Sequence, residues 1–180
     1  FSVQIYCDFS GYTDMAIGIS LLLGINLPTN FLSPYNSKSL TEFWRTWHIT
    51  LSNFLKDYIY IPLGGNKQGT IIRLRNLITT MLLGGLWHGA NWTFLIWGAL
   101  HGLGLALINL KNKLFVNFPK IPKFLSIFIT FNFVSIAWIF FRAQNIAQSL
   151  KVIKQLFEFN LSDIKEFFIV NSFPIGLILF

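Results

Sequence analysis

The hydrophobic pattern of the chain is dominated by long uncharged segments. The longest covers 35 residues between Arg75 and Lys111. As one α-helix it would be about 52 Å long at about 1.5 Å per residue, whereas the hydrocarbon core of a bilayer is about 30 Å thick. A break is therefore needed near the middle, where Gly89 weakens a helix and Asn91 is a good N-cap. The sequence predicts two short spans, 71–87 and 92–110, that meet at this turn.

Other apolar segments predict further membrane helices. Phe124–Phe141 is an uncharged run of eighteen residues, and another run begins near Phe167. The segment Met15–Leu27 has only thirteen residues, so it is either the end of a longer span or a re-entrant helix packed in protein. We expect Thr13 or Asp14 to cap a helix that begins at Met15.

One segment has the pattern of an amphipathic helix over Ser39–Tyr60. Apolar residues recur at the i, i+3, i+4 and i+7 offsets of one helix face. Ser39 and Glu42 form a predicted capping box at its start, and Gly64-Gly65 predicts a turn after it. Such a helix lies at a membrane interface or lines a cavity, rather than crossing lipid. The apolar positions are Leu40, Phe43, Trp44, Trp47, Leu51, Phe54, Leu55 and Tyr58.

Composition supports the membrane interpretation. Charged residues make up 12% of the chain and hydrophobic ones 53%, and the mean hydropathy is +0.56. These values exclude a disordered chain, and the lone Cys7 excludes an internal disulfide scaffold. The predicted fold class is an all-α integral membrane protein, a multi-span helical bundle with broken or re-entrant helices and an amphipathic interfacial helix. Because the chain begins at Phe1 and ends inside the run Phe167–Phe180, we expect it to be one membrane domain truncated at both ends.

The net charge of +7 fits the positive-inside rule better than nucleic-acid binding, because the basic residues flank apolar runs. If the two spans meet at the turn near residue 88, seven basic residues fall on one side and four on the other. The seven-residue side is predicted to be cytoplasmic. That side holds Lys67, Arg73, Arg75, Lys111, Lys113, Lys120 and Lys123, and the other holds Arg142, Lys151, Lys154 and Lys165.

The three histidines are the candidates for chemistry, because ionisable groups at membrane depth are costly. His88 lies in the predicted break, which must be buried in protein or line a water-filled cavity. A buried imidazole is neutral near pH 7, as a general base must be. His48 lies in the apolar stripe of the amphipathic helix, where packing and a functional role remain equally open. His101 lies beside Gly98, Gly102 and Ala106, a small-residue ridge typical of helix packing, so we interpret it as a structural hydrogen-bonding residue.

Other chemistries have weaker support in the sequence. The spacing of the histidines matches no metal motif, so no metal site is expected. Cys7 has only Asp8 nearby and lacks a group that would activate a thiol.

Three ordered motifs give the chain a specific family resemblance. They are YCDFSGYTDMAIG (Tyr6–Gly18), FWRTWHITLSNFLKDYIYIPLGG (Phe43–Gly65) and WHGANWTFLIWGALHG (Trp87–Gly102). Together they resemble the membrane-bound O-acyltransferase (MBOAT) family, in its bacterial branch of alginate and peptidoglycan O-acetyltransferases. The likeness is dense over residues 4–105, and WIFFRA (Trp138–Ala143) resembles a later motif of the family.

The resemblance implies an acyltransferase that moves an acyl group from a thioester to a hydroxyl. His88 matches the histidine regarded as catalytic in the family, and His48 matches its second histidine. The implied donor is a cytoplasmic thioester such as acetyl-CoA, with no tightly bound cofactor. The implied acceptor is a polysaccharide outside the bacterial inner membrane, with a periplasmic SGNH-type esterase-like protein as partner. In this hypothesis His88 is the general base at the outer side, while His48 orients the donor or relays the proton through a tunnel.

Two other classes remain open from the residues. A transporter or channel with intramembrane histidines would also contain broken helices. A purely structural membrane subunit would tolerate replacement of His88.

Overall fold

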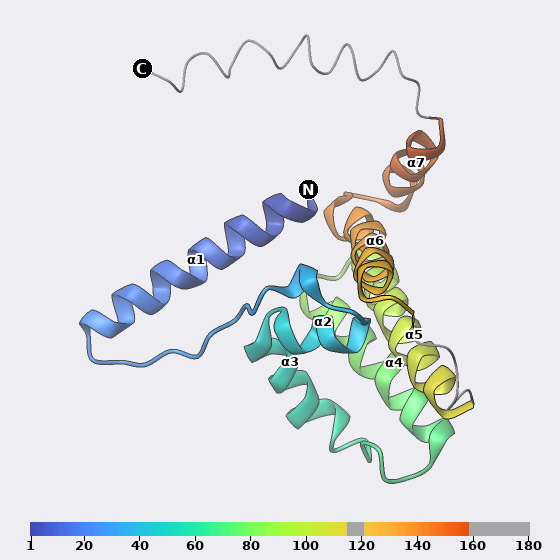
Figure 1. Cartoon of the computed structure of the whole chain (residues 1–180), viewed down its shortest axis with the longest axis horizontal. Helices are drawn as coiled ribbons and strands as arrows, with labels where there is room; N and C mark the ends of the chain where they lie inside the picture. The colour runs from blue at the N-terminus through green and yellow to red at the C-terminus, as the bar shows by residue number, and fades with distance from the viewer. Residues whose placement is uncertain (115–120, 159–180) are drawn as a thin grey trace.

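The computed structural model describes residues 1–114 and 121–158, and within those ranges every regular element is helical and no strand occurs. Figure 1 shows the arrangement. The predicted span that begins near Phe167 lies outside the described residues. The elements are α1 (Ser2–Leu22), a 3₁₀ turn η1 (Pro34–Asn36), α2 (Leu40–Thr46), α3 (Ile49–Leu55), a π-helical segment η2 (Lys56–Tyr60), α4 (Thr70–Trp87), α5 (Trp92–Leu114), α6 (Lys123–Arg142) and α7 (Ile146–Phe157).

Helices α4 and α5 form a closely packed antiparallel hairpin. A Cβ added to Gly85 would lie 2.4 Å from the carbonyl oxygen of Phe94, and one added to Gly98 would lie 2.4 Å from that of Met81. Both distances are far shorter than a carbon–oxygen contact allows, so only glycine permits this approach. The predicted packing role of the small-residue ridge is confirmed at Gly98 and also at Gly102, where a Cβ would lie 2.9 Å from Ile78 Cα.

The break predicted between the two uncharged halves is confirmed. Helix α4 ends at Trp87 and α5 begins at Trp92. The N-cap role of Asn91 is also confirmed, because its Oδ1 accepts a hydrogen bond from the backbone N–H of Thr93 at 3.1 Å. Gly89 has a φ of +151°, a conformation that side chains disfavour. These residues form a tight turn that holds His88 between the two helices.

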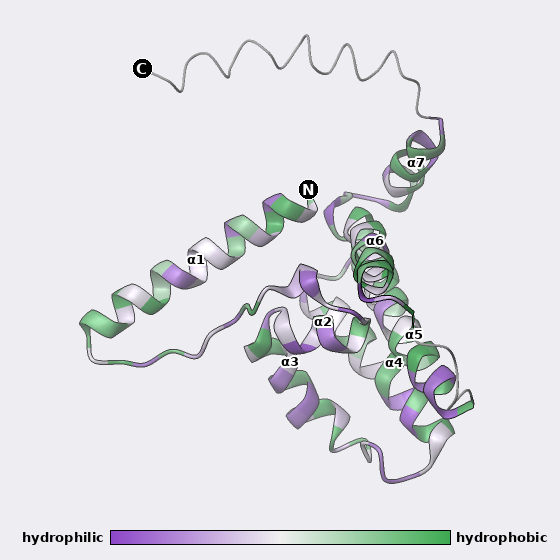
Figure 2. Cartoon of the chain, viewed as in Figure 1, coloured by the Kyte–Doolittle hydropathy of each residue, from purple (hydrophilic) through white to green (hydrophobic). Residues whose placement is uncertain are grey.

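Hydrogen bonds mark the two ends of the α4–α5 hairpin. At one end, Asn91 Nδ2 donates to the carbonyl oxygen of Gln144 at 3.0 Å, which joins the His88 turn to the segment after α6. At the other end, Lys113 Nζ donates to Thr70 Oγ1 at 2.5 Å. Figure 2 shows hydrophilic residues on α3 and at the lower ends of α4 and α5, while α6 is largely apolar.

Two described helices, α5 and α6, are long and apolar enough to cross a membrane, judged by length and composition. Helix α4, predicted as a span over 71–87, is not among them. It carries Arg73 and Arg75 in its first two turns.

The core lies where α2, α5 and α6 meet. Its largest buried side chains are aromatic, and Trp97, Trp138 and Phe43 are each no more than 2% exposed. The rings of Trp97 and Trp138 are stacked with centroids 5.9 Å apart. Flat aromatic pairs of this kind stabilise a core beyond the area they bury, and here they join α5 to α6.

The structure corrects the prediction of one continuous amphipathic helix over Ser39–Tyr60. The segment is divided into α2, α3 and η2, and the division falls at His48, whose φ of 43° and ψ of 57° are left-handed. The first part of the apolar stripe faces protein, because Trp47, Leu51 and Leu55 are buried, whereas Phe54 and Tyr58 are exposed. Trp44, Trp47, His48 and Leu51 of this segment line a cavity, as one of the two predicted places requires.

Two capping predictions also need correction. Helix α1 begins at Ser2, so Thr13 and Asp14 lie inside the helix and do not start one at Met15. The capping box of α2 is half formed. Ser39 Oγ accepts from the backbone N–H of Glu42 at 3.2 Å, but Glu42 Oε2 accepts from the backbone N–H of Lys38 rather than Ser39.

Candidate functional site

His48 and His88, forty residues apart in the chain, line the same small cavity of about 40 Å³. A volume of about 10–15 Å³ is enough for one water molecule, so this cavity is large enough for a small polar group. The cavity lies where α1, the α2–α3 break, the His88 turn, α5 and α6 converge. Its lining consists of Ile5, Phe9, Trp44, Trp47, His48, Leu51, His88, Trp97, Trp138 and Phe141.

His88 is held by aromatic contacts rather than by hydrogen bonds. The centroid of its ring lies 4.9 Å from that of Phe141 and 5.3 Å from that of Trp97, both edge-to-face. Its side-chain nitrogens make no hydrogen bond with the described residues. Burial lowers the pKa of His88 from its ordinary value of 6.5. The imidazole is therefore neutral at pH 7, with a nitrogen lone pair available to take a proton.

His48 has a specific polar environment on one edge of its ring. Its Nδ1 lies 3.2 Å from Asn30 Oδ1, and its ring makes a T-shaped contact with that of Phe9, with centroids 4.8 Å apart. Burial first, and the charge of nearby His88 second, lower the pKa of His48 to about 4. His48 is therefore neutral at pH 7. Its left-handed backbone is uncommon for a residue with a side chain, and such conformations cluster at functional sites.

His101 is separate from this cavity and fully buried. Its Nδ1 accepts a hydrogen bond of 3.2 Å from the indole Nε1–H of Trp44. This bond connects α5 to α2, as expected of a structural histidine. The sequence-based separation of His101 from the other two histidines therefore matches their geometry.

The tunnel hypothesis puts the amphipathic segment that contains His48 on the cytoplasmic side and His88 toward the outside, whereas in the structure both imidazoles line one cavity. His48 lies at the break between α2 and α3, and His88 lies in the turn between α4 and α5. Their proximity could not be read from the sequence, because it depends on the left-handed conformation of His48.

Several cavity residues were not singled out from the sequence. Phe9 belongs to the first quoted motif, Trp97 to the third, and Trp138 and Phe141 to the last. Their membership in the motifs was the available signal, but nothing in their spacing indicated a shared cavity. The acidic residues of the first motif behave differently, because Asp8 and Asp14 are both exposed.

The donor set of the site does not resemble a metal centre. Within residues 1–114 and 121–158, no three His, Cys, Asp or Glu side chains gather closely enough to hold a metal ion. The cavity instead offers two imidazoles within an aromatic wall. This donor set suits proton transfer and hydrogen bonding to a small polar group.

The described residues thus form a helical protein with two apolar helices of spanning length and a cavity lined by two histidines. The model of the MBOAT, membrane-bound O-acyltransferase family, matches residues 1–149. The chain therefore belongs to this family.

Curated relatives give the same assignment. The chain is 53% identical over 161 residues to a peptidoglycan O-acetyltransferase of Helicobacter pylori, an alignment that covers 89% of this chain and 31% of the relative. It is 49% identical over 167 residues to the probable alginate O-acetylase AlgI of Pseudomonas aeruginosa, covering 92% and 32% respectively. A teichoic acid D-alanyltransferase of Streptococcus thermophilus is 33% identical over 163 residues, covering 78% and 39%. The chain thus spans about a third of the length of these relatives.

Proposed function

We propose that the complete protein is an O-acyltransferase that moves an acetyl group from a thioester to a hydroxyl of a cell-envelope polysaccharide. The observation that carries the proposal is the shared cavity of His48 and His88. Family membership over residues 1–149 gives the class of reaction. The relatives named for peptidoglycan and alginate acetylation support acetyl as the acyl group and a polysaccharide as the acceptor.

In the proposed reaction, His88 is the general base. Its free ring nitrogen takes the proton from the acceptor hydroxyl as the oxygen attacks the carbonyl carbon of the thioester. A C–O bond forms, the C–S bond breaks, and the thiolate leaves and takes a proton to become the free thiol.

His48 has a supporting role in this proposal. With a pKa of about 4 it is a weaker base than an ordinary histidine, which makes it poorly suited to take the proton itself. Its remaining lone pair can accept a hydrogen bond and so orient the hydroxyl toward His88. His48 therefore orients a reactant while His88 takes the proton.

The proposed enzyme is a multi-pass protein of the bacterial inner membrane, with the His88 turn entering the membrane from the outer side. Its donor is a cytoplasmic thioester such as acetyl-CoA. Its product goes outward to the polysaccharide, with an SGNH-type periplasmic protein as partner. The uneven distribution of basic residues supports this orientation.

The test uses the complete polypeptide that carries this chain, purified and reconstituted in lipid vesicles with acetyl-labelled acetyl-CoA. Acetylated acceptor and free CoA thiol should appear in equal amounts when an acceptor saccharide is present. A transporter or channel would move a substrate without breaking the thioester. Flux with no release of thiol, under conditions in which the parent cell acetylates its envelope, would contradict the proposal.

A further inference from the structure

One polar residue beside the cavity has no part in the mechanism above. Asn30 lies in the segment between α1 and η1, eighteen residues before His48. Its Oδ1 accepts three contacts: from Thr50 Oγ1 at 2.7 Å, from the backbone N–H of Thr50 at 3.2 Å, and from His48 Nδ1 at 3.2 Å. Its backbone oxygen accepts from the N–H of Ile49 at 3.1 Å.

The backbone contacts determine how the Asn30 amide is oriented. The N–H of Thr50 can only donate, so the amide atom that it meets is the oxygen. An amide oxygen can only accept, so His48 Nδ1 must carry the hydrogen in its bond to Asn30. The neutral imidazole has a single N–H, and its Nε2 therefore bears the lone pair.

We propose that Asn30 is a positioning residue that fixes His48 in the Nδ1–H tautomer and so presents Nε2 to the cavity as a hydrogen-bond acceptor. This inference rests on the proposed function, because it assigns His48 the task of accepting a hydrogen bond from the attacking hydroxyl. Nε2 makes no hydrogen bond with the described residues, so it is available for that task. Asn30 itself does not line the cavity.

The same contacts explain how the left-handed break at His48 is maintained. The first N–H groups of a helix have no partner within the helix. In α3, those of Ile49 and Thr50 are satisfied by the backbone oxygen and the side chain of Asn30. One residue thus stabilises the start of α3, the backbone of the break and the orientation of the His48 ring.

The first test compares Asn30→Asp with Asn30→Leu in the complete protein. Aspartate keeps an acceptor oxygen at the same position and should retain activity within about 10-fold of the parent. Leucine removes the acceptor, so the imidazole can rotate and change tautomer, and kcat should fall about 10²-fold. Thermal midpoints in detergent identify any variant that fails to fold.

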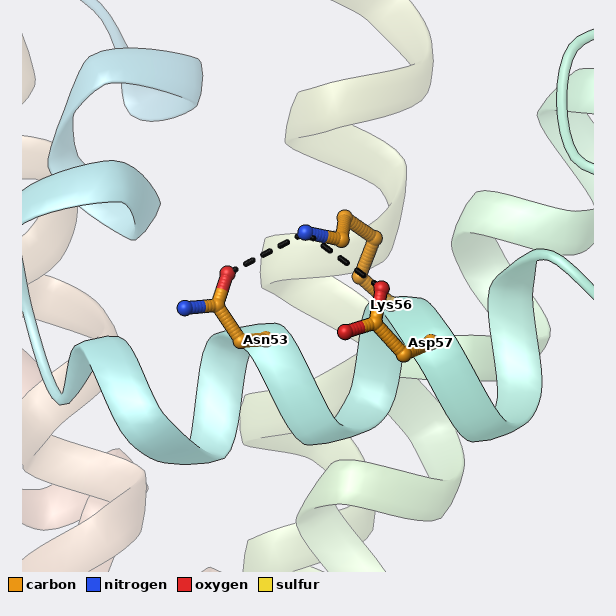
Figure 3. Close-up of polar contacts among 3 residues, drawn as sticks. All are labelled: Asn53, Lys56 and Asp57. Atoms are coloured by element: carbon orange, nitrogen blue, oxygen red, sulfur yellow. Dashed lines mark hydrogen bonds and ion pairs between the residues drawn. The ribbon is translucent and has the colours of Figure 1, made fainter.

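A matched control is available on α3, the helix whose first N–H groups contact Asn30. Asn53 lies on α3, where its Oδ1 accepts from Lys56 Nζ at 3.2 Å, and that Nζ lies 3.4 Å from Asp57 Oδ1 (Figure 3). Asn53 does not line the cavity. Asn53→Leu should therefore leave kcat near the parent value.

The second test reads the tautomer directly and does not depend on a variant being active. In the parent protein, the ¹⁵N resonances of His48, assigned by their loss in His48→Gln, should show a protonated Nδ1 and an unprotonated Nε2. The opposite pattern would overturn the inference. So would parent-level kcat in Asn30→Leu, or equal inactivity of Asn30→Asp and Asn30→Leu when both are folded.

Failure of the inference about Asn30 and failure of the proposed role of His48 give different experimental results. If His48→Gln is inactive while Asn30→Leu matches the parent, the inference about Asn30 is wrong and the proposed function stands. If His48→Gln is as active as the parent, the proposed role of His48 is wrong, and the inference falls with it.

Discussion

At the scale of single residues, the three histidines have different environments. His88 has aromatic neighbours and free nitrogens, His48 has an oriented ring in a strained backbone, and His101 is fully buried with a bonded Nδ1. These environments support the proposed roles of His88 in proton transfer, His48 in orientation and His101 in packing.

His101 gives a prediction about stability. His101→Leu leaves the indole N–H of Trp44 buried without an acceptor, which costs about 1–3 kcal/mol. His101→Gln offers an amide oxygen and should recover part of that loss. The thermal midpoint of the detergent-purified protein measures both. A midpoint for His101→Leu equal to that of the parent would contradict the structural role.

The lowered pKa of His88 gives a prediction about pH. A general base works in its neutral form, and protonation inactivates it. Because burial lowers the pKa of His88 below 6.5, kcat/KM should stay level as the pH falls from 7.5 to 6.5 and decline only below that value. His48, with a pKa of about 4, stays neutral throughout this range. A decline centred above pH 7 would contradict the assignment.

At the scale of elements, the sequence predicted the α4–α5 hairpin well. A single helix over the uncharged segment would be longer than the bilayer core is thick, so a break was required. Gly89 and Asn91 indicated its position. The prediction failed for Ser39–Tyr60, because hydrophobic periodicity continues through His48 even though the helix does not. Asn30, which accepts hydrogen bonds at the break, lies in a segment before η1. The hydrophobic periodicity of Ser39–Tyr60 therefore contains no information about it.

The glycine contact between α4 and α5 gives a prediction at this scale. Gly85→Ala places a methyl group against the carbonyl oxygen of Phe94, so the helices must separate, at a cost of about 1–3 kcal/mol. The His88 turn would shift with them, and both thermal midpoint and kcat should fall.

The matched control for this prediction is Gly104→Ala on α5. Its Cβ would meet only side-chain ends, Leu40 Cδ2 at 2.7 Å and Phe133 Cζ at 3.0 Å, which can move aside. It should therefore lower the midpoint less than Gly85→Ala does. An equal or smaller effect of Gly85→Ala would show that this close contact is not required.

At the scale of the whole molecule, the described helices have two distinct ends. The His88 turn and Gln144 lie at one, and Thr70 and Lys113 lie at the other. The family and the membrane character could be predicted from ordered motifs and composition. The meeting of α1, the α2–α3 break and α6 around one cavity could not, because it depends on tertiary packing of side chains with no sequence periodicity in common.

Membrane orientation gives the prediction at this scale. In a Cys7→Ser background, a cysteine at Lys123 should react with a membrane-impermeant thiol reagent only after the cells are opened. A cysteine at Gln148 should react in intact spheroplasts. The opposite pattern would reverse the topology and remove the His88 turn from the outer side.

The central claim is that His88 is the base for acyl transfer, and His88→Gln tests it most directly. Glutamine is similar in size and forms hydrogen bonds, but it cannot take up the proton. General-base catalysis contributes about 10²–10⁴-fold, so the purified complete variant should transfer acetyl groups more slowly by at least that lower factor, at a normal membrane level. His101→Gln, measured beside it, should retain substantial activity. If His88→Gln accumulates normally and acetylates the acceptor at the parent rate, the account of this site is wrong.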